Sequence, residues 1–460
     1  MKKSMFLMCV AAATLASCSQ EDVLDVAANH GADNAINFRV RTLKATRGVD
    51  MVADDLQSFK VFGLKGSIDE YRDGNQSEPL TQWWGDAIEF KRSTVEGDDH
   101  ENYGRYFRSD IPMYYPTDYS FVTFLAYAPA ELGGVSPVLD SSDPNEHGNL
   151  LISNYTVNAD INAQEDIIVD GGSSMRDEEY SSYDLTFKHA LSKVFVSHVM
   201  NNDERYSYKV AGVRFGNIAM TGNGMYDPYG YSDSYSDYFK WTVAENPTDK
   251  AEYIFNEGVE IDGNTELMSN SGTDGSFLLI PQQLQYVTKE GIEDEGDGVH
   301  NLVCKEGVAY VGLLIRITEK NLKGEDEVVY PFAQGVANIT ETVNGEEYAW
   351  AIFPVSTNWL AGNYIDYQVD FSKGAGFVAP GAEGFRHPWS SQPGDEDYSE
   401  EDEWWVNLEY TPILGSEIKF TVTIMDWDRS NTDSTVQQGG DDHSKEVWQD
   451  GGSVEDPFGE

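Results

Sequence analysis

Cys18 is the residue best placed for covalent chemistry. Lys2 and Lys3 form a short positive segment, residues 5–15 are apolar or small, and small residues directly precede the cysteine. This order is typical of a lipoprotein signal peptide. The apolar run is too short to span a bilayer core of roughly 30 Å. We therefore predict that residues 1–17 are a signal peptide and that Cys18 carries a lipid such as palmitate, with residues 18–34 forming the anchor and linker.

The next segment combines an apolar face with a basic end. Ile36, Phe38 and Val40 alternate with polar residues, which predicts an edge strand with one buried face. The small and basic residues 44–48 follow, ending in Arg47 and Gly48.

Motifs for catalysis or metal binding are missing from the sequence. The eight histidines form no His-x-x-x-His pair, and neither a Gly-x-Ser-x-Gly elbow nor a Gly-rich phosphate loop occurs. His189 belongs to a predicted strand, where we expect a hydrogen-bonded structural histidine rather than a general base. We predict no enzyme activity, no cofactor and no metal.

Two aromatic regions have the composition of binding loops. Tyrosines alternate with acidic residues in 225–239, at Tyr226, Tyr229, Tyr231, Tyr235 and Tyr238. Tyrosine is a rigid amphipathic contact residue, so this stretch has two open interpretations: an adhesive loop for protein or glycan, or a loop whose rings cover a sandwich end. The same alternatives hold for the acidic residues 395–403 between Trp389 and Trp404, where sugar stacking or calcium capture is the binding interpretation. Their spacing matches no known calcium loop.

The charge composition limits the classes of molecule that this protein can bind. The sequence has 31 basic and 79 acidic residues, a formal net charge of −48. Such a surface repels nucleic acid and bare anionic headgroups, so membrane contact is expected only through the lipid. Once the signal peptide and the lipidated Cys18 are set aside, Cys304 stands alone and no intramolecular disulfide forms.

Periodicity indicates an all-β protein. Apolar and β-branched runs recur between Asn-, Gly-, Asp- and Pro-rich turns, and no long helical period appears; the predicted strands include 59–63, 121–127, 193–200, 210–215, 277–280, 309–318, 348–355, 364–371 and 419–427. The Gly- and Ser-rich stretch 171–182 divides the chain into two sandwich-sized parts, 35–180 and 183–429. Residues 430–460 are predicted to be an acidic disordered tail.

The segment 183–194, Tyr-Asp-Leu-Thr-Phe-Lys-His-Ala-Leu-Ser-Lys-Val, resembles the start of the second domain in the fimbrillin-like family of type V pilus subunits and accessory proteins. Shorter pieces at 114–129, 164–168, 278–284, 359–364 and 420–427 occur in the same order as in that family. The resemblance implies two tandem transthyretin-like β-sandwich domains and a place in cell-surface fimbriae at the outer membrane.

The resemblance also implies a role for the first strand. In stalk subunits of this family a protease cuts after an arginine, the first strand leaves, and another subunit inserts its own strand. Arg47 matches that arginine, with an ordinary basic turn as the alternative interpretation. Residues 429–460 make a poor donor strand, because they lack a long apolar alternation. Two classes of function therefore stay open: a fimbrial subunit of the stalk or the tip, and a free-standing surface lipoprotein that binds glycan or peptide. A hydrolase whose site the sequence does not reveal is the third class.

Overall fold

A computed structural model gives the fold. It describes residues 35–40, 56–66, 80–94, 105–116, 121–139, 148–174, 182–228, 238–268, 275–284, 307–332, 339–355, 357–372, 374–382, 385–386, 405–406, 408–415 and 418–426. These residues form strands and loops with two short 3-10 turns, η1 (Ile161–Ala163) and η5 (Ile413–Gly415), and no α-helix. The predicted all-β class is confirmed. Within the same ranges, no helix has the length and apolar character to cross a membrane.

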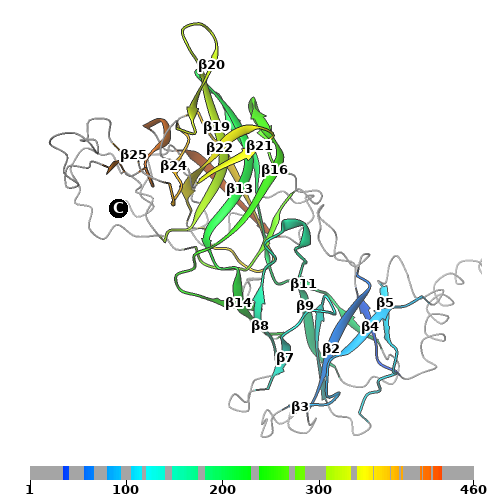
Figure 1. Ribbon diagram of the computed structural model, residues 1–460. Helices are drawn as coiled ribbons and strands as arrows, with labels where there is room; N and C mark the ends of the chain where they lie inside the picture. Colours follow the sequence, from blue (N-terminus) through cyan, green and yellow to red (C-terminus); the bar gives the residue numbers. More distant parts are fainter. Residues whose placement is uncertain are drawn as a thin grey trace, which may run out of the picture.

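A nine-stranded sheet forms the N-terminal part, at the lower right of Figure 1. Its order is β10-β1-β5-β4-β2-β6-β9-β11, and β3 pairs with β2. The strands are β1 (Asn37–Val40), β2 (Ser58–Gly66), β3 (Thr81–Gln82), β4 (Ile88–Arg92), β5 (Arg105–Ser109), β6 (Phe121–Ala128), β9 (Ile168–Ser174), β10 (Ser182–Leu185) and β11 (Lys188–His189).

The two faces of this sheet belong to different cores. On β2, Phe59 and Val61 pack in an N-terminal aromatic core with residues from β1, β4, β5, β6, β9 and β10. Phe62 and Leu64, which also lie on β2, belong to the larger core that continues to the C-terminal part. Since β10 and β9 lie near opposite ends of the strand order and both contribute to the aromatic core, the sheet curls around it.

A four-stranded sheet, β15-β14-β8-β7, connects the two parts of the molecule. It consists of β7 (Val135–Val138), β8 (Asn149–Thr156), β14 (Thr221–Tyr226) and β15 (Phe239–Val243). In the chain, β7 and β8 precede the predicted boundary and β14 and β15 follow it. The division into 35–180 and 183–429 therefore stays a prediction, with one sheet built from both sides of it.

Two sheets face each other in the C-terminal part, the upper part of Figure 1. Phe215 of one sheet contacts the rings of Phe277 and Tyr367 of the other, at 5.4 and 5.8 Å between centroids. This packing is that of a β-sandwich. The seven-stranded sheet contains β13 (Tyr206–Ile218), β16 (Asp249–Ile261), β19 (Tyr310–Lys320), β20 (Asp326–Tyr330), β21 (Thr340–Val343), β22 (Glu346–Pro354) and β24 (Phe377–Val378).

The five-stranded sheet contains β12 (Ser192–Asn201), β17 (Gly263–Glu266), β18 (Phe277–Leu279), β23 (Asn363–Asp370) and β27 (Lys419–Asp426). A further pair consists of β25 (Phe385–Arg386) and β26 (Trp405–Val406). Each strand predicted from an apolar run is present within a few residues of its expected bounds. The transthyretin-like topology of the sandwiches stays a prediction.

The predicted linker 171–182 begins inside a strand, which corrects that part of the sequence interpretation. Gly171 and Gly172 belong to β9 and pair with β6. A Cβ atom at Gly171 would lie 2.5 Å from the Phe124 carbonyl oxygen, and one at Gly172 would lie 2.3 Å from the Tyr183 hydroxyl. The glycines are there because neighbouring groups approach closely, and not because the backbone needs to be a linker.

We therefore expect Gly171→Ala to destabilise the fold by about 1–3 kcal/mol, the usual range for overpacking against atoms that cannot move away. Gly133→Ala is the matched control, since a Cβ atom added at Gly133 would meet no other atom within 4 Å. Urea unfolding followed by circular dichroism measures both. Equal stability of the two variants would contradict this account of the glycine.

Candidate functional site

Strand β1 lies inside the nine-stranded sheet and not at its edge. It pairs in parallel with β10, so that Phe38 stands opposite Tyr183, and antiparallel with β5, so that Phe38 stands opposite Phe107. The prediction of an edge strand is therefore wrong, although the strand itself and its buried face are confirmed. The alternation of apolar residues specifies a face, but it carries no information about hydrogen bonds on either side.

The apolar face of β1, together with the preceding Ile36, packs into the aromatic core. Ile36, Phe38 and Val40 are each at most 1% exposed. The ring of Phe38 makes edge contacts with Phe90 at 4.6 Å and with Phe124 at 5.1 Å between centroids. Edge-to-face geometry is favourable for aromatic pairs beyond the area they bury. We call the space that β1 occupies between β10 and β5 the β1 slot.

The polar face of β1 carries an ion pair. The Arg39 guanidinium donates from Nε to Asp184 Oδ1 at 2.5 Å and from Nη2 to Asp184 Oδ2 at 2.6 Å. Asp184 lies on β10, directly opposite Arg39 in the parallel register. The hydrogen bond to Asp184 is the main cause that raises the pKa of Arg39 above its ordinary value. Two parallel bonds fix both position and orientation, so the pair holds β1 in register.

The start of β1 is also tied to the rest of the domain. The Ile36 amide donates to the Met113 carbonyl at 2.7 Å, and Ala35 forms an isolated bridge with Tyr114. The predicted lipidation site Cys18 and the predicted cleavage site Arg47 and Gly48 lie outside the described residues.

The two ends of the tyrosine-rich stretch are buried. Tyr226 is 1% and Tyr238 6% exposed, and their rings lie 6.3 Å apart. The Tyr238 hydroxyl donates to the His189 carbonyl. These two tyrosines hold the ends of the stretch in the core. Of the five tyrosines proposed to bind a ligand, this leaves Tyr229, Tyr231 and Tyr235, which lie outside the described residues.

His189 occupies a buried structural position. It is 4% exposed, and its Nδ1 lies 2.7 Å from Asp166 Oδ2, which agrees with the expected hydrogen-bonded role. A second histidine, His198, contacts the hydroxyl of the adjacent Ser197. The nearby Asp366 accepts from the backbone N–H of Ser197 rather than from the imidazole, so these three residues do not have the arrangement of a catalytic triad.

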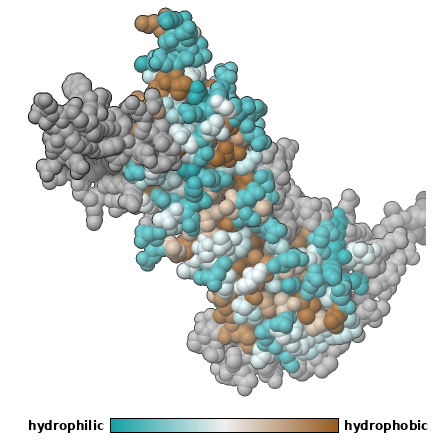
Figure 2. Space-filling view, in the orientation of Figure 1, coloured by the Kyte–Doolittle hydropathy of each residue, from teal (hydrophilic) through white to brown (hydrophobic). Residues whose placement is uncertain are grey.

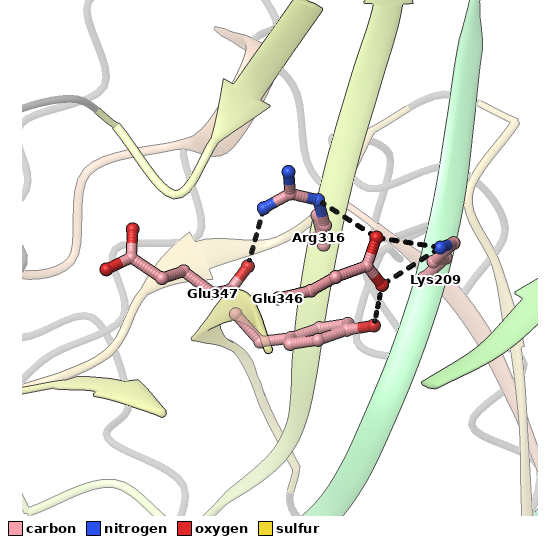
Figure 3. Close-up of polar contacts among 5 residues, drawn as sticks. Lys209, Arg316, Glu346 and Glu347 are labelled. Atoms are coloured by element: carbon pink, nitrogen blue, oxygen red, sulfur yellow. Dashed lines mark hydrogen bonds and ion pairs between the residues drawn. The ribbon is translucent and has the colours of Figure 1, made fainter. Parts of the chain in front are cut away.

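A charged cluster lies on the seven-stranded sheet, far along the chain from β1 (Figure 3). The Glu346 carboxylate accepts from Lys209 at 3.0 and 2.9 Å and from the Tyr348 hydroxyl at 2.9 Å, and Arg316 lies 4.0 Å away. The Lys209 hydrogen bond is the main cause that lowers the Glu346 pKa. Both cations share the Glu346 carboxylate, so the cluster is a cross-strand ion-pair network.

The face seen in Figure 2 has hydrophilic residues interspersed with hydrophobic ones.

Comparison with known proteins identifies the family. The model of the fimbrillin-like family matches residues 85–381. The chain belongs to this family. No curated protein sequence matches it. Fimbrillin-like membership supports a fimbrial or adhesive role at the cell surface, in association with other fimbrial subunits, rather than an enzymatic one.

Solved structures resemble this fimbrillin-like chain. A fimbrial protein from Bacteroides vulgatus is 13% identical, with a TM-score of 0.41, and the match covers 73% of this chain and 94% of that one. A fimbrial assembly protein from Parabacteroides distasonis is 10% identical, with a TM-score of 0.31, and the match covers 74% and 92%. At such values the likeness carries no argument about function, which rests on the family match.

A half-buried carboxyl group, that of Asp170, lies beside the end of β10. Asp170 of β9 accepts from the backbone N–H of Thr186, the residue after β10. Burial is the main cause that raises the pKa of Asp170 to about 6, and the N–H of Thr186 and the charge of Lys188 act in the opposite direction. Sequence reasoning missed this residue, because one aspartate among many gives no sign of its surroundings.

The raised pKa of Asp170 in this fimbrillin-like fold has a defined effect on stability. Because the folded pKa lies above the ordinary 3.8, the charged form destabilises the folded state at neutral pH, and stability is gained as pH falls from above 6 toward 3.8. We expect Asp170→Asn, which keeps an acceptor for Thr186, to stabilise the protein by about 1 kcal/mol at pH 7.5 and hardly at all at pH 4.

Urea unfolding at the two pH values measures the difference. Glu165→Gln, which removes one charge from an exposed position nearby, is the control and is expected to change stability equally little at both. An Asp170→Asn effect that does not depend on pH would contradict the assignment.

Proposed function

We propose that this chain is a lipid-anchored component of type V fimbriae in which cleavage after Arg47 frees β1 and opens the β1 slot to a strand of another subunit. The observation that carries the proposal is the position of β1. It fills an interior place in the sheet, and its neighbours there are β5 and β10 rather than β2, the next strand in the chain. Its departure therefore breaks no hairpin.

Filling the empty slot with a replacement strand is energetically favourable. Loss of β1 exposes the surroundings of three fully buried side chains, whose burial is worth roughly 5 kcal/mol, and leaves unpaired backbone groups on both β5 and β10. Two unpaired edges facing one another bind an added strand on both sides, a stronger form of strand addition than pairing at one edge. The cysteines are at positions 9, 18 and 304, so no disulfide holds residues 35–47 in place.

The position of Arg47 suits cleavage better than that of Arg41. Arg41 directly follows Val40, which is paired with both β10 and β5. A protease needs several extended residues around the cut, and pairing of Val40 withholds them. Arg47 follows seven residues after Val40 in the sequence.

We expect an arginine-specific protease at limiting dose to generate a new N-terminus at Gly48. The cleaved chain should then exchange β1 for a labelled peptide of residues 35–42 present in excess, because the slot offers the peptide the same contacts. Fluorescence anisotropy measures uptake, and light scattering with electron microscopy measures assembly.

Two controls accompany this experiment. Arg47→Ala should give no terminus at Gly48 and take up far less peptide, and a peptide with Phe38→Ser should bind poorly, because it places a polar group in the aromatic core. Cleaved protein that takes up no peptide, even after long incubation, would refute strand exchange in this chain.

The lipid anchor has its own test. Cys18→Ala should abolish labelling by a radioactive fatty acid and release the protein from the outer membrane, because the acceptor sulfur is gone. Cys304→Ala, which removes a sulfur elsewhere in the chain, should leave labelling unchanged. Persistent label on Cys18→Ala would show that the anchor has been placed at the wrong residue.

A further inference from the structure

We infer that the β1 slot selects its incoming strand by charge: the strand must carry an arginine or lysine directly after a large apolar residue, so that the cation meets Asp184. This inference rests on the proposed function and names the partner that the slot accepts. The partner is a strand of another subunit with the order aromatic, basic, aliphatic. The chain's own residues Phe38, Arg39 and Val40 have this order.

The polar rim of the slot includes one carboxylate of β10, that of Asp184. Asp184 stands opposite position 39 in the parallel pairing, and its side chain is 28% exposed, with Arg39 at 24%. Both carboxylate oxygens are used by the guanidinium, at 2.5 and 2.6 Å. When β1 leaves, this half-buried carboxylate loses the cation that compensates its partial removal from water. A strand that restores the cation is favoured over one that does not.

The aromatic core fixes which residue of an incoming strand meets Asp184. Successive side chains of a strand point to opposite faces, so the residue after the one that fills the Phe38 position must point to the rim. Phe38 is 0% exposed and is surrounded by the rings of Phe59, Phe90 and Phe124. A large apolar side chain is required there. The two requirements therefore apply to neighbouring residues of the same strand.

A wrong residue at the rim weakens binding by a definite mechanism. A neutral residue leaves the carboxylate without its bidentate partner, and an acidic residue adds direct repulsion at short range. Like charges placed together are a common means of rejecting wrong partners. Slipping the register by one residue to avoid the repulsion would turn the apolar residues out of the core.

The end of this sequence does not meet the requirement. Residues 427–460 contain two basic residues, Arg429 and Lys445, which follow Asp428 and Ser444 and not an aromatic residue. The last strand among the described residues, β27, has Thr421 after Phe420. Residues 427–460 therefore do not contain a matching donor strand.

The test uses the full chain cleaved after Arg47 and labelled peptides of residues 35–42 with arginine, lysine, leucine or glutamate at position 39. We expect the arginine and lysine peptides to bind best, the leucine peptide about tenfold more weakly, and the glutamate peptide more weakly still. The protein variant Asp184→Lys should reverse the order of the arginine and glutamate peptides. Asp184→Asn, the milder variant, should reduce the difference between them.

Asp110→Lys is the matched control. Asp110, the residue after β5, forms an exposed ion pair with Lys91 of β4 at 2.6 Å, so the variant makes the same charge change at a carboxylate that pairs with β4 and not with β1. It should leave the peptide order unchanged. If Asp184→Lys does not fold, the peptide series on the wild type and on Asp184→Asn decides the question.

The outcomes separate the two proposals. Equal binding of all four peptides by the wild-type protein would overturn selection by Asp184 while leaving strand exchange in place. A preference for arginine that persists undiminished in Asp184→Asn would also overturn it. Failure of every peptide to bind would refute strand exchange itself, and the inference with it.

Discussion

The N-terminal part of the molecule depends on one constraint: something must fill the gap between β5 and β10. The strand β1 does so with backbone pairing on both sides, an aromatic face and one ion pair. Without it the nine-stranded sheet has two internal edges, and the rings around Phe38 lose the side chain that they surround. A strand of four residues thereby closes a core to which six other strands contribute.

The residues that follow β10 connect the slot to the C-terminal part of the molecule. After Leu185 pairs with Val40, the next residue donates its N–H to Asp170, and Lys188 then places its ammonium over the ring of Tyr238. Tyr238 in turn belongs to the core shared with the C-terminal sandwich. The strand that forms one wall of the slot is thus continuous with the junction between the two parts, at the centre of Figure 1. A few residues therefore connect the wall of the slot to the junction.

The sequence predicted what alternation and long apolar runs can specify. The strand at 36–40, its buried face and the strands of the sandwich follow from burial on one face. The strand β16 was missed because most of its residues are exposed or half-buried, which leaves little apolar alternation to detect. The sequence did not predict the inner position of β1 or the pairing of Arg39 with Asp184. Both depend on the order of strands in the sheet, and the two paired residues are 145 positions apart. Gly171 was wrongly assigned to a linker, because the sequence does not distinguish a glycine required by close packing from one in a flexible loop.

The large net negative charge of the chain and the single carboxylate at the slot act over different distances. With a formal net charge of −48, two copies of such a chain repel one another at long range. Salt at about 0.15 M screens that repulsion beyond roughly 8 Å, so it slows approach but does not distinguish one donor strand from another. Asp184 acts at hydrogen-bonding distance and is partly shielded from water, where screening is weakest. Discrimination among strands that share an apolar face is therefore set at this position, by whether the donor brings a cation to Asp184.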